Sequence, residues 1–357
     1  MNIKDLKVNE CCGCAICEAV CPKDAIKIVL TDEGFYEPVI NEEKCVNCSV
    51  CTKTCYKGLE LDIKKPYKDG IETYSAYNND AHDRYHSSSG GLASVLAKQC
   101  IADGYTVVGV EYDYIEEIAK TSFAKTEEEV YKFSGSKYFQ SKNIDALKAI
   151  MSDGKDTKYA IFGTPCQIYA LRKYARDKKC EERFLFVDIF CHGCPSLKLW
   201  EKYLAYIKKK SKFDKFDSIE FRSKRAGWHE YVYVFKSGER EYVTKKNFNM
   251  FYTMFFDKNI LCRACYDCRV RSSFDFPDIR IGDFWGKRFD TNADGVSAVV
   301  VCTQRGKELF QKIEDKISFE RQSLEEVVAW QSFGKTHSCD DKLRAVALGE
   351  FKKDTPF

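Results

Sequence analysis

The residues of this chain that are best suited to chemistry are its cysteines. There are 19 cysteines among 357 residues, and nine of them fall within the first 55 positions. The first seven residues contain no apolar signal-peptide core, and no run of 18 apolar residues occurs. We therefore expect a cytoplasmic protein without a membrane span. In that reducing compartment, dense cysteines bind metals or react more often than they form disulfides.

One cysteine motif, C-x2-C-x2-C-x3-C, occurs twice near the N-terminus. In this motif three thiolates bind one 4Fe-4S cluster, while the fourth cysteine ligates the neighbouring cluster. The spacing therefore predicts two clusters, the first held by Cys11, Cys14, Cys17 and Cys55, and the second by Cys45, Cys48, Cys51 and Cys21. A pair of zinc sites is the alternative, although zinc does not need eight interleaved cysteines.

The segment that carries this repeat resembles a bacterial two-cluster ferredoxin domain, which we assign to residues 1–60. Residues 25–40 alternate in polarity around Asp32-Glu33-Gly34, a pattern that predicts a β-hairpin beside the clusters. Two residues depart from the repeat. Cys12 is an additional cysteine, which we predict is not a ligand, and Tyr56 stands where the first repeat has Pro22.

The remainder of the chain predicts a larger domain over residues 74–345, after a charged linker at residues 61–73. Apolar runs with strand character alternate with helical segments, which indicates βαβ units and a mixed sheet. We expect strands at 105–110, 159–162, 184–190, 278–283 and 297–302, antiparallel strands at 217–222, 231–236 and 241–245, and helices at 92–101, 167–174 and 197–210. The fold class is therefore α+β, with a small ferredoxin-like domain followed by a larger mixed α/β domain.

Several cysteines of the larger domain follow predicted strands. Cys166 comes after the strand at 159–162 and a Gly-Thr-Pro turn, and Cys191 follows the strand at 184–190. Open α/β sheets bind ligands beyond the carboxyl ends of their strands, so these two cysteines are expected to converge. Cys262, Cys265 and Cys268 add a C-x2-C-x2-C run. We predict a third 4Fe-4S cluster; the alternatives are zinc on the same thiols, or a redox-active pair formed by Cys191 and Cys194.

Taken together, these motifs resemble the family of coenzyme F-420 hydrogenase/dehydrogenase beta subunits. The resemblance spans roughly residues 5–340. Besides the ferredoxin-like start, it rests on Ser88-Ser89-Gly90-Gly91, Gly135-Ser136-Lys137-Tyr138, Gly163-Thr164-Pro165-Cys166, Cys191-His192-Gly193, Cys265-Tyr266-Asp267-Cys268 and the run from Asp278 to Gly286. It implies an iron-sulfur flavoprotein, with FAD in the larger domain and a 4Fe-4S cluster beside it.

The resemblance also assigns residues to these cofactors. It implies that the third cluster is bound by Cys166, Cys191, Cys265 and Cys268, whereas Cys194 and Cys262 depart from the family pattern and leave that ligand set open. For FAD we predict contacts from Ser88, Ser89, Gly90, Gly91, Ser136, Lys137 and Tyr138.

A local argument supports part of this FAD assignment. Ser87-Ser88-Ser89-Gly90-Gly91 precedes a helical run, so that backbone N–H groups could face a diphosphate. A serine-rich helix cap is the alternative interpretation. His192 could tune the cluster or move a proton, although a structural hydrogen bond explains it at least as well. His229 could face the flavin, but a satisfied surface histidine is the better interpretation.

Several functional classes find no support. The lysine-rich stretches 143–158 and 204–215 contain interspersed acidic residues, which is typical of solvated helix faces, so we expect no nucleic-acid partner. No GxGxxG fingerprint follows a strand, and no Ser-His-Asp or paired-carboxylate motif stands out. The formal charge of +3 falls to about −3 when three clusters, each carrying about −2, are bound.

Two functions follow from these expectations. In the first, the chain is an oxidoreductase that moves electrons between 4Fe-4S clusters and FAD, and FAD exchanges hydride with a small-molecule substrate such as a deazaflavin coenzyme. Its redox partner would be ferredoxin or another redox protein. In the second, the chain is an electron-transfer component of a larger complex, and it connects a flavin to a separate hydrogenase, dehydrogenase or reductase. A non-redox zinc scaffold is a third, weaker interpretation.

Overall fold

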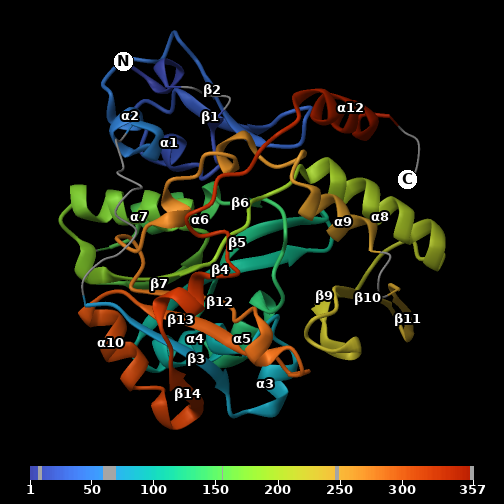
Figure 1. Ribbon diagram of the computed structural model, residues 1–357. Helices are drawn as coiled ribbons and strands as arrows, with labels where there is room; N and C mark the ends of the chain where they lie inside the picture. The colour runs from blue at the N-terminus through green and yellow to red at the C-terminus, as the bar shows by residue number, and fades with distance from the viewer. Residues whose placement is uncertain (7–9, 59–69, 155, 246–248, 354–357) are drawn as a thin grey trace.

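The computed structural model describes residues 1–6, 10–58, 70–154, 156–245 and 249–353. The ferredoxin-like segment is built from two short helices and one antiparallel hairpin (Figure 1). Its elements are α1 (Ile16–Ala19), β1 (Ile26–Leu30), β2 (Tyr36–Ile40) and α2 (Val50–Thr54). The hairpin confirms the prediction for residues 25–40. Most of the predicted linker, residues 61–69, lies outside the described residues, and the next strand begins at Glu72.

A nine-stranded mixed sheet forms the centre of the larger part of the chain. Its order is β14 (Ile317–Arg321), β3 (Glu72–Asn78), β13 (Ser297–Val301), β12 (Ile279–Asp283), β8 (Phe184–Ile189), β7 (Lys158–Gly163), β4 (Tyr105–Asp113), β5 (Ile118–Ala124) and β6 (Ser141–Lys142). The four neighbours β12, β8, β7 and β4 are parallel, whereas β13, β3 and β14 add antiparallel pairs on one side. The carboxyl ends of the four parallel strands therefore lie at one edge of the sheet.

The central strands are apolar on both faces because helices cover both faces. In β8, Phe184 and Phe186 pack into one core, while Leu185 and Val187 pack into the opposite one. The second core is covered by α4 (Leu92–Ala102) and α10 (Gln304–Gln311). The first core is covered by α6 (Ile144–Ser152), α7 (Pro165–Asp177), α8 (Leu197–Ser211) and α9 (Met250–Asp257).

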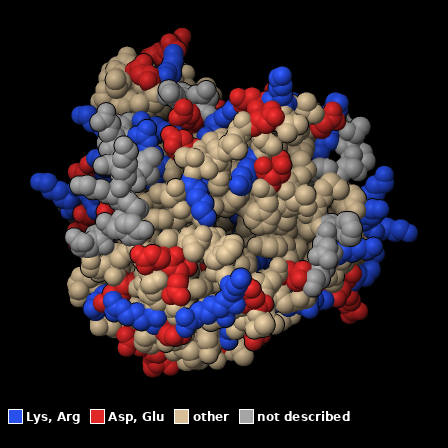
Figure 2. Space-filling view, in the orientation of Figure 1, with Lys and Arg blue, Asp and Glu red and all other residues tan. Residues whose placement is uncertain are grey.

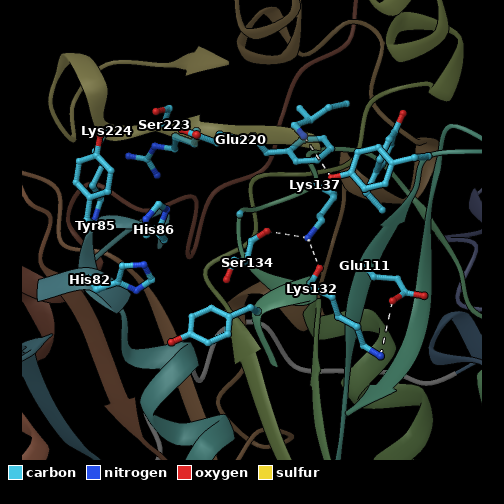
Figure 3. Close-up of a pocket in the computed structure, with 17 residues that line it drawn as sticks. His82, Tyr85, His86, Glu111, Lys132, Ser134, Lys137, Glu220, Ser223 and Lys224 are labelled. Carbon is cyan, nitrogen blue, oxygen red and sulfur yellow. Dashed lines mark hydrogen bonds and ion pairs between the residues drawn. The ribbon is translucent and has the colours of Figure 1, made fainter. Parts of the chain in front are cut away.

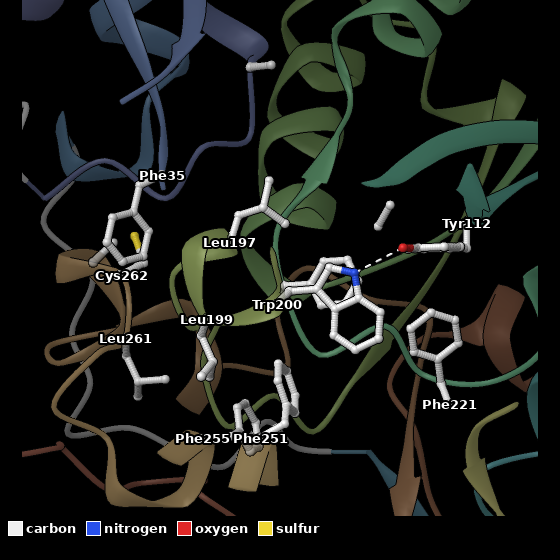
Figure 4. Packing of buried hydrophobic residues seen from close by; sticks show 14 of the residues in the cluster. Phe35, Tyr112, Leu197, Leu199, Trp200, Phe221, Phe251, Phe255, Leu261 and Cys262 are labelled. Atoms are coloured by element: carbon white, nitrogen blue, oxygen red, sulfur yellow. Dashed lines mark hydrogen bonds between the residues drawn. The ribbon is translucent and has the colours of Figure 1, made fainter. Parts of the chain in front are cut away.

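A smaller antiparallel sheet lies beside this core, with strands β9 (Ser218–Ser223), β10 (Val232–Ser237) and β11 (Arg240–Val243). Trp200 of α8 packs against it, stacking on Phe139 with ring centroids 4.8 Å apart, and its Nε1 donates to the hydroxyl of Tyr112 at 3.1 Å (Figure 4). Large aromatic side chains thus fix the end of β4 against the small sheet. The remaining helices are α3 (Ala81–Tyr85), α5 (Glu127–Val130), α11 (Leu324–Val328) and α12 (Asp341–Phe351).

The predicted strands and helices listed above agree with the structure to within a few residues at each end. Within the described part of the chain, no helix is long and apolar enough to cross a membrane. Basic and acidic side chains interleave over much of the face shown in Figure 2.

Candidate metal centres and ligand cavity

The first cysteine set comprises Cys11, Cys14, Cys17 and Cys55, and the structure brings these four residues together. Cys17 is buried on α1, and its thiol lies near those of the other three. Burial, together with the neighbouring Cys14, raises the pKa of Cys55 to about 11. Four thiols crowded away from water in this way form a donor set that suits a metal cluster, which would remove their protons on binding.

The second cysteine set, Cys21, Cys45, Cys48 and Cys51, lies nearer the surface. Cys51 packs with Cys21 in a small apolar cluster that includes Ile3, whereas Cys48 is exposed. Backbone and side-chain N–H groups already face two of these sulfurs, since the N–H of Ala25 donates to Cys21 at 3.3 Å and the Asn2 side chain donates to Cys45 at 3.6 Å. N–H donors of this kind stabilise the negative sulfurs of iron-sulfur clusters.

The cysteines of the larger part of the chain line one common cavity, which confirms that Cys166 and Cys191 converge. We call Cys166, Cys191, Cys265 and Cys268 the third cysteine set and this space the cysteine cavity. Its wall is completed by Cys12, Tyr56, Thr164, Pro165, Gly193, Cys194, Cys262, Ala264 and Arg271. A cavity lined by seven thiols offers more than the four thiolates that one 4Fe-4S cluster requires.

Local sequence explains how Cys166 reaches this cavity. Gly163 ends β7, the Thr164 side chain and Gln167 form a capping box, and Pro165 begins α7. These residue types are those that start a helix immediately after a strand. Cys166 is therefore held in the first turn of α7, and the Thr164 hydroxyl lies 3.2 Å from its sulfur.

The opposite wall of the cysteine cavity requires a glycine. Gly193 has φ +147°, and a Cβ atom at this position would lie 2.9 Å from the Leu261 side chain and 3.3 Å from Cβ of Cys265. Only a residue without a side chain lets the chain after β8 approach the segment of Cys265 this closely. Gly193 thus places Cys191 opposite Cys265.

Three additional thiols lie beside members of these sets. The pairs are Cys12 with Cys14 and Cys166, Cys194 with Cys191, and Cys262 with Cys265. The neighbouring Cys262 thiol lowers the pKa of Cys265 to about 7, and the Cys194 thiol lowers the pKa of Cys191. In both pairs the pKa of the additional thiol is raised well above its ordinary value. The arrangement favours thiolates at Cys191 and Cys265, which is the form that binds metal.

The ferredoxin-like segment packs directly against the cysteine cavity. The Cys262 thiol donates to the carbonyl oxygen of Cys11 at 2.9 Å. Gln140 joins the two parts as well, because its Nε2 donates to the carbonyl of Cys12 at 3.0 Å and its Oε1 accepts the N–H of Tyr36 at 3.0 Å. The first and third cysteine sets are therefore neighbours in space.

A second, larger space, which we call the ligand cavity, has a volume of about 530 Å³. It lies where β4, β9 and α3 meet, and its size is typical of small-molecule sites. Figure 3 shows His82, Tyr85 and His86 on one side of it and Lys137 and Glu111 on the other. Its basic lining residues are His82, His86, Lys132, Lys137, Arg222 and Lys224, against the acidic Glu111 and Glu220. This balance of charge suits an anionic ligand.

Arg222 is the best-positioned cation of the ligand cavity. Its Nη1 donates to the Asp283 carboxylate at 2.7 Å and its Nη2 to the carbonyl of Trp228 at 3.2 Å, while its buried Nε has no partner among the described residues. Asp283 raises the pKa of Arg222 despite its burial. Asp283 also accepts the Trp228 indole N–H at 2.7 Å. A fixed guanidinium with an unused donor can receive an acceptor atom from a ligand.

Two lysines of the ligand cavity are held by backbone carbonyl groups. The ammonium of Lys137 donates to the carbonyls of Ser134 at 2.9 Å and Phe133 at 3.1 Å, and burial lowers its pKa to about 7. The ammonium of Lys224 donates to the carbonyls of Arg84, Ser89 and Asp294, each at 2.5 Å. Burial and the nearby Arg84 and Arg222 lower the pKa of Lys224 to about 7, whereas its three carbonyl acceptors favour the protonated form, which has the three N–H donors they require.

Of the seven residues predicted to bind FAD, Lys137 alone lines the ligand cavity. Ser88 accepts the backbone N–H of Ser136 at 2.9 Å, and Ser89 donates to the carbonyl of Val296 at 3.0 Å. Gly90 and Gly91 precede α4, where a Cβ atom on Gly90 would lie 2.6 Å from the carbonyl oxygen of Ala76. This serine-glycine segment borders the cavity through the bond from Lys224 to the carbonyl of Ser89.

Tyr138 does not line the ligand cavity but packs between the two sites. Its ring lies 5.3 Å from that of Tyr252 and 5.4 Å from that of Phe255, and Phe255 in turn lies 5.1 Å from His192. Burial lowers the pKa of His192 to about 3, so this ring is neutral. Nε2 of His229 donates to the carbonyl oxygen of Phe289 at 3.1 Å, and His229 does not line the cavity.

Sequence reasoning missed several residues of these sites. Arg222, Lys224 and Arg271 were not singled out, because single basic residues in strands and loops carry no spacing signal. The one available signal was the run from Asp278 to Gly286, which contains Asp283. The structure gives Asp283 a role, since its carboxylate accepts a hydrogen bond from Arg222 and holds that side chain at the ligand cavity.

Three family models match this chain. Residues 10–59 match the model described as "4Fe-4S dicluster domain". The other two models both carry the description "Coenzyme F420 hydrogenase/dehydrogenase, beta subunit". Its amino-terminal model matches residues 73–148, and its carboxy-terminal model matches residues 156–327.

Individual relatives are distant in sequence. The chain is 24% identical to a subunit of the F(420)H(2) dehydrogenase of Methanosarcina mazei, over 86% of the chain and 83% of that protein. It is also 24% identical to the coenzyme F420-dependent sulfite reductase of Methanocaldococcus jannaschii, of which it spans 51%. A chain in a structure of the F420-reducing nickel-iron hydrogenase complex of Methanosarcina barkeri has 19% identity and a TM-score of 0.49, covering 79% of this chain and 89% of that one.

Proposed function

The chain belongs to the family of coenzyme F-420 hydrogenase/dehydrogenase beta subunits and carries a 4Fe-4S dicluster domain, and we propose that it is an iron-sulfur flavoprotein oxidoreductase. In this proposal, electrons pass between three 4Fe-4S clusters and FAD, and FAD exchanges hydride with a small-molecule substrate. The observation that carries the proposal is the spatial order of four sites, from the second cysteine set, in which Cys48 is exposed, through the first and third sets towards the ligand cavity.

The third cysteine set supports a cluster within the body of the protein. We propose Cys166, Cys191, Cys265 and Cys268 as its ligands. The lowered pKa values of Cys191 and Cys265 support two of these ligands, because they favour the thiolate form. Tyr56, Ala264 and Arg271 close the rest of the cavity, which suits a cluster shielded from water.

The ligand cavity supports a flavin or an anionic substrate. Arg222, whose Nε has no partner among the described residues, would face a negative group, while Tyr85, Tyr112, Tyr131 and Phe221 supply aromatic surface. FAD would supply the conversion between hydride, which carries two electrons, and the single electrons that iron-sulfur clusters accept. The aromatic contacts from Tyr138 through Phe255 to His192 connect this cavity with the chain beside Cys191.

The composition of the purified protein tests this proposal. After anaerobic purification, about twelve irons and one FAD per chain are expected. Eight irons without flavin would contradict both the third cluster and the flavin chemistry. Zinc in a colourless protein would contradict the iron-sulfur assignment altogether.

A second candidate function follows from the relatives, two of which are named as subunits of a dehydrogenase or a hydrogenase. In this alternative the chain transfers electrons to a separate hydrogenase, dehydrogenase or reductase and has no substrate of its own. Stoichiometric co-purification with such a partner, together with turnover only in its presence, would favour the alternative. Anaerobic turnover by the isolated chain, assayed with reduced deazaflavin coenzyme and with reduced ferredoxin, would favour an independent enzyme.

A further inference from the structure

Tyr56 occupies an unusual place between two cysteine sets. It directly follows Cys55, at the position where the first cysteine repeat has Pro22. It begins a short 3-10 helix (Tyr56–Gly58), and its side chain is only 3% exposed. Although it belongs to the ferredoxin-like segment, it lines the cysteine cavity of the larger part of the chain.

The hydroxyl of Tyr56 lies among sulfur atoms and has no hydrogen-bond partner among the described residues. Its neighbours are the thiols of Cys12, Cys166, Cys265 and Cys268. A buried tyrosine O–H normally finds an acceptor, because an unpaired donor away from water is unfavourable. The acceptor that this hydroxyl lacks is therefore expected to belong to a group bound in the cavity.

Two other polar side chains of the cavity, Thr164 and Arg271, do not share this property. The Thr164 hydroxyl already has a protein acceptor, since it lies 3.1 Å from Oε1 of Gln167. Arg271 donates to the carbonyl oxygens of His192 and Cys265, and its Nη1 also contacts the His337 ring. Its guanidinium is thus used to hold the chain around the cavity. Tyr56, in contrast, offers its donor without a protein acceptor among the described residues.

We propose that Tyr56 donates its O–H to a sulfur atom of the cluster bound by the third cysteine set and thereby raises the reduction potential of that cluster. The inference rests on the third cluster of the proposed function. Reduction adds negative charge to the cluster, so a hydrogen-bond donor stabilises the reduced form more than the oxidised form. Because Tyr56 follows Cys55 directly, the same short segment supplies a ligand of the first cluster and raises the reduction potential of the third cluster.

Tyr169 of α7 provides a matched control. Its ring packs edge-on against that of Tyr56, with centroids 6.1 Å apart and an interplanar angle of 74°. It is also buried, and its hydroxyl likewise lacks a partner among the described residues. Tyr169 does not line the cysteine cavity, however, and its neighbours are Cys55 and Cys14 of the first set. Both tyrosines can be changed to phenylalanine with loss of one oxygen atom and no change of ring packing.

The experiment is an anaerobic redox titration of the full chain followed by electron paramagnetic resonance, with iron content measured in parallel. In Tyr56→Phe we expect an unchanged iron content and a third-cluster midpoint potential shifted to a more negative value. In Tyr169→Phe we expect no shift, so that the midpoint potential of the third cluster equals that of the unchanged protein. The signal of the third cluster is identified as the one that Cys265→Ser removes.

The outcomes separate this inference from the proposed function. If the unchanged protein holds only about eight irons, the third cluster itself is refuted. If about twelve irons are present and Tyr56→Phe leaves the third-cluster potential in place, the role of Tyr56 is refuted while the cluster stands. If Tyr56→Phe and Tyr169→Phe shift the midpoint potential of the third cluster equally, the effect belongs to the aromatic pair in general, and the inference is also overturned.

Discussion

The thiol of Cys262 donates a hydrogen bond to the carbonyl oxygen of Cys11, at 2.9 Å across 251 positions of sequence. A thiol that donates in this way carries its proton, whereas an iron ligand is a thiolate. The contact joins the ferredoxin-like segment to the wall of the cysteine cavity, and we propose from it that Cys262 is not a ligand of the third cluster. In this proposal the role of Cys262 differs from that of Cys265, a proposed ligand of the third cluster that lies only three positions further along the chain.

Cys265→Ser and Cys262→Ser should therefore behave differently. We expect Cys265→Ser to lose about four irons per chain, because a serine hydroxyl does not replace a thiolate ligand. Cys262→Ser should keep all of its irons, since a serine hydroxyl can still donate to the Cys11 carbonyl. Iron and sulfide quantitation after anaerobic purification measures both. Loss of about four irons in Cys262→Ser would place this residue among the ligands.

Arg222→Gln should weaken flavin binding. The substitution removes a guanidinium that Asp283 fixes at the ligand cavity, and hydrogen bonds to charged groups contribute about 1.5–3 kcal/mol, or roughly tenfold to a hundredfold in affinity. Arg225→Gln is the control, since Arg225 pairs with Glu241 at the surface and does not line the cavity. Flavin content and a titration of FAD into the deflavinated protein measure the effect. Equal flavin affinities in the two variants would contradict the placement of FAD.

Arg280→Met should destabilise the sheet. Arg280 of β12 and Asp188 of β8 are both fully buried, and Nε and Nη2 of Arg280 donate to the Asp188 carboxylate at 2.6 and 2.5 Å. Removing one partner leaves a buried charge unpaired, which costs about 3–5 kcal/mol. Arg288→Met breaks the exposed pair with Glu320 and should cost only about 0–1 kcal/mol. Denaturant unfolding of both variants tests this contrast.

Glu18 should make the attachment of the ferredoxin-like segment dependent on pH. Its buried carboxylate accepts the N–H of Ile28 at 2.7 Å and Nζ of Lys148 on α6 at 2.8 Å. Burial opposes ionisation, but these hydrogen bonds prevail and lower the pKa of Glu18 below its ordinary value of 4.5. The stabilisation is therefore complete above about pH 4.5 and is lost as pH falls through the lower, folded-state pKa.

Glu18→Gln tests this dependence. At neutral pH we expect a lower unfolding free energy than in the unchanged protein, by about 1.5–3 kcal/mol. That difference should stay constant above about pH 5 and shrink only as the pH falls below about 4.5, because the unchanged protein then loses the same charge. Glu43→Gln, at an exposed position, is the control. A difference that stays constant with pH would contradict the role of the Glu18 charge.

Local sequence predicted much of this protein because the decisive signals act over short distances. Cysteine spacing indicated the iron-sulfur motifs, and apolar runs such as residues 184–190 indicated strands whose bounds the structure confirms within a few residues. The turn chemistry of Gly163, Thr164 and Pro165 placed Cys166 at the start of a helix, and the structure shows it there. Each of these signals depends on backbone preferences within one turn or one strand.

Tertiary structure alone decided which residues share a site. The packing of the ferredoxin-like segment on the larger sheet brings Cys11 to Cys262 and Tyr56 to the cysteine cavity, and the small sheet brings Arg222 to Asp283. The partners in these contacts are separated by about 60 to 250 positions, and no local periodicity encodes them. The sequence thus determined that this protein has iron-sulfur motifs and strands. The fold determined which thiols share a cavity and which cations line the ligand cavity, because burial and contacts of this kind arise only when distant segments meet.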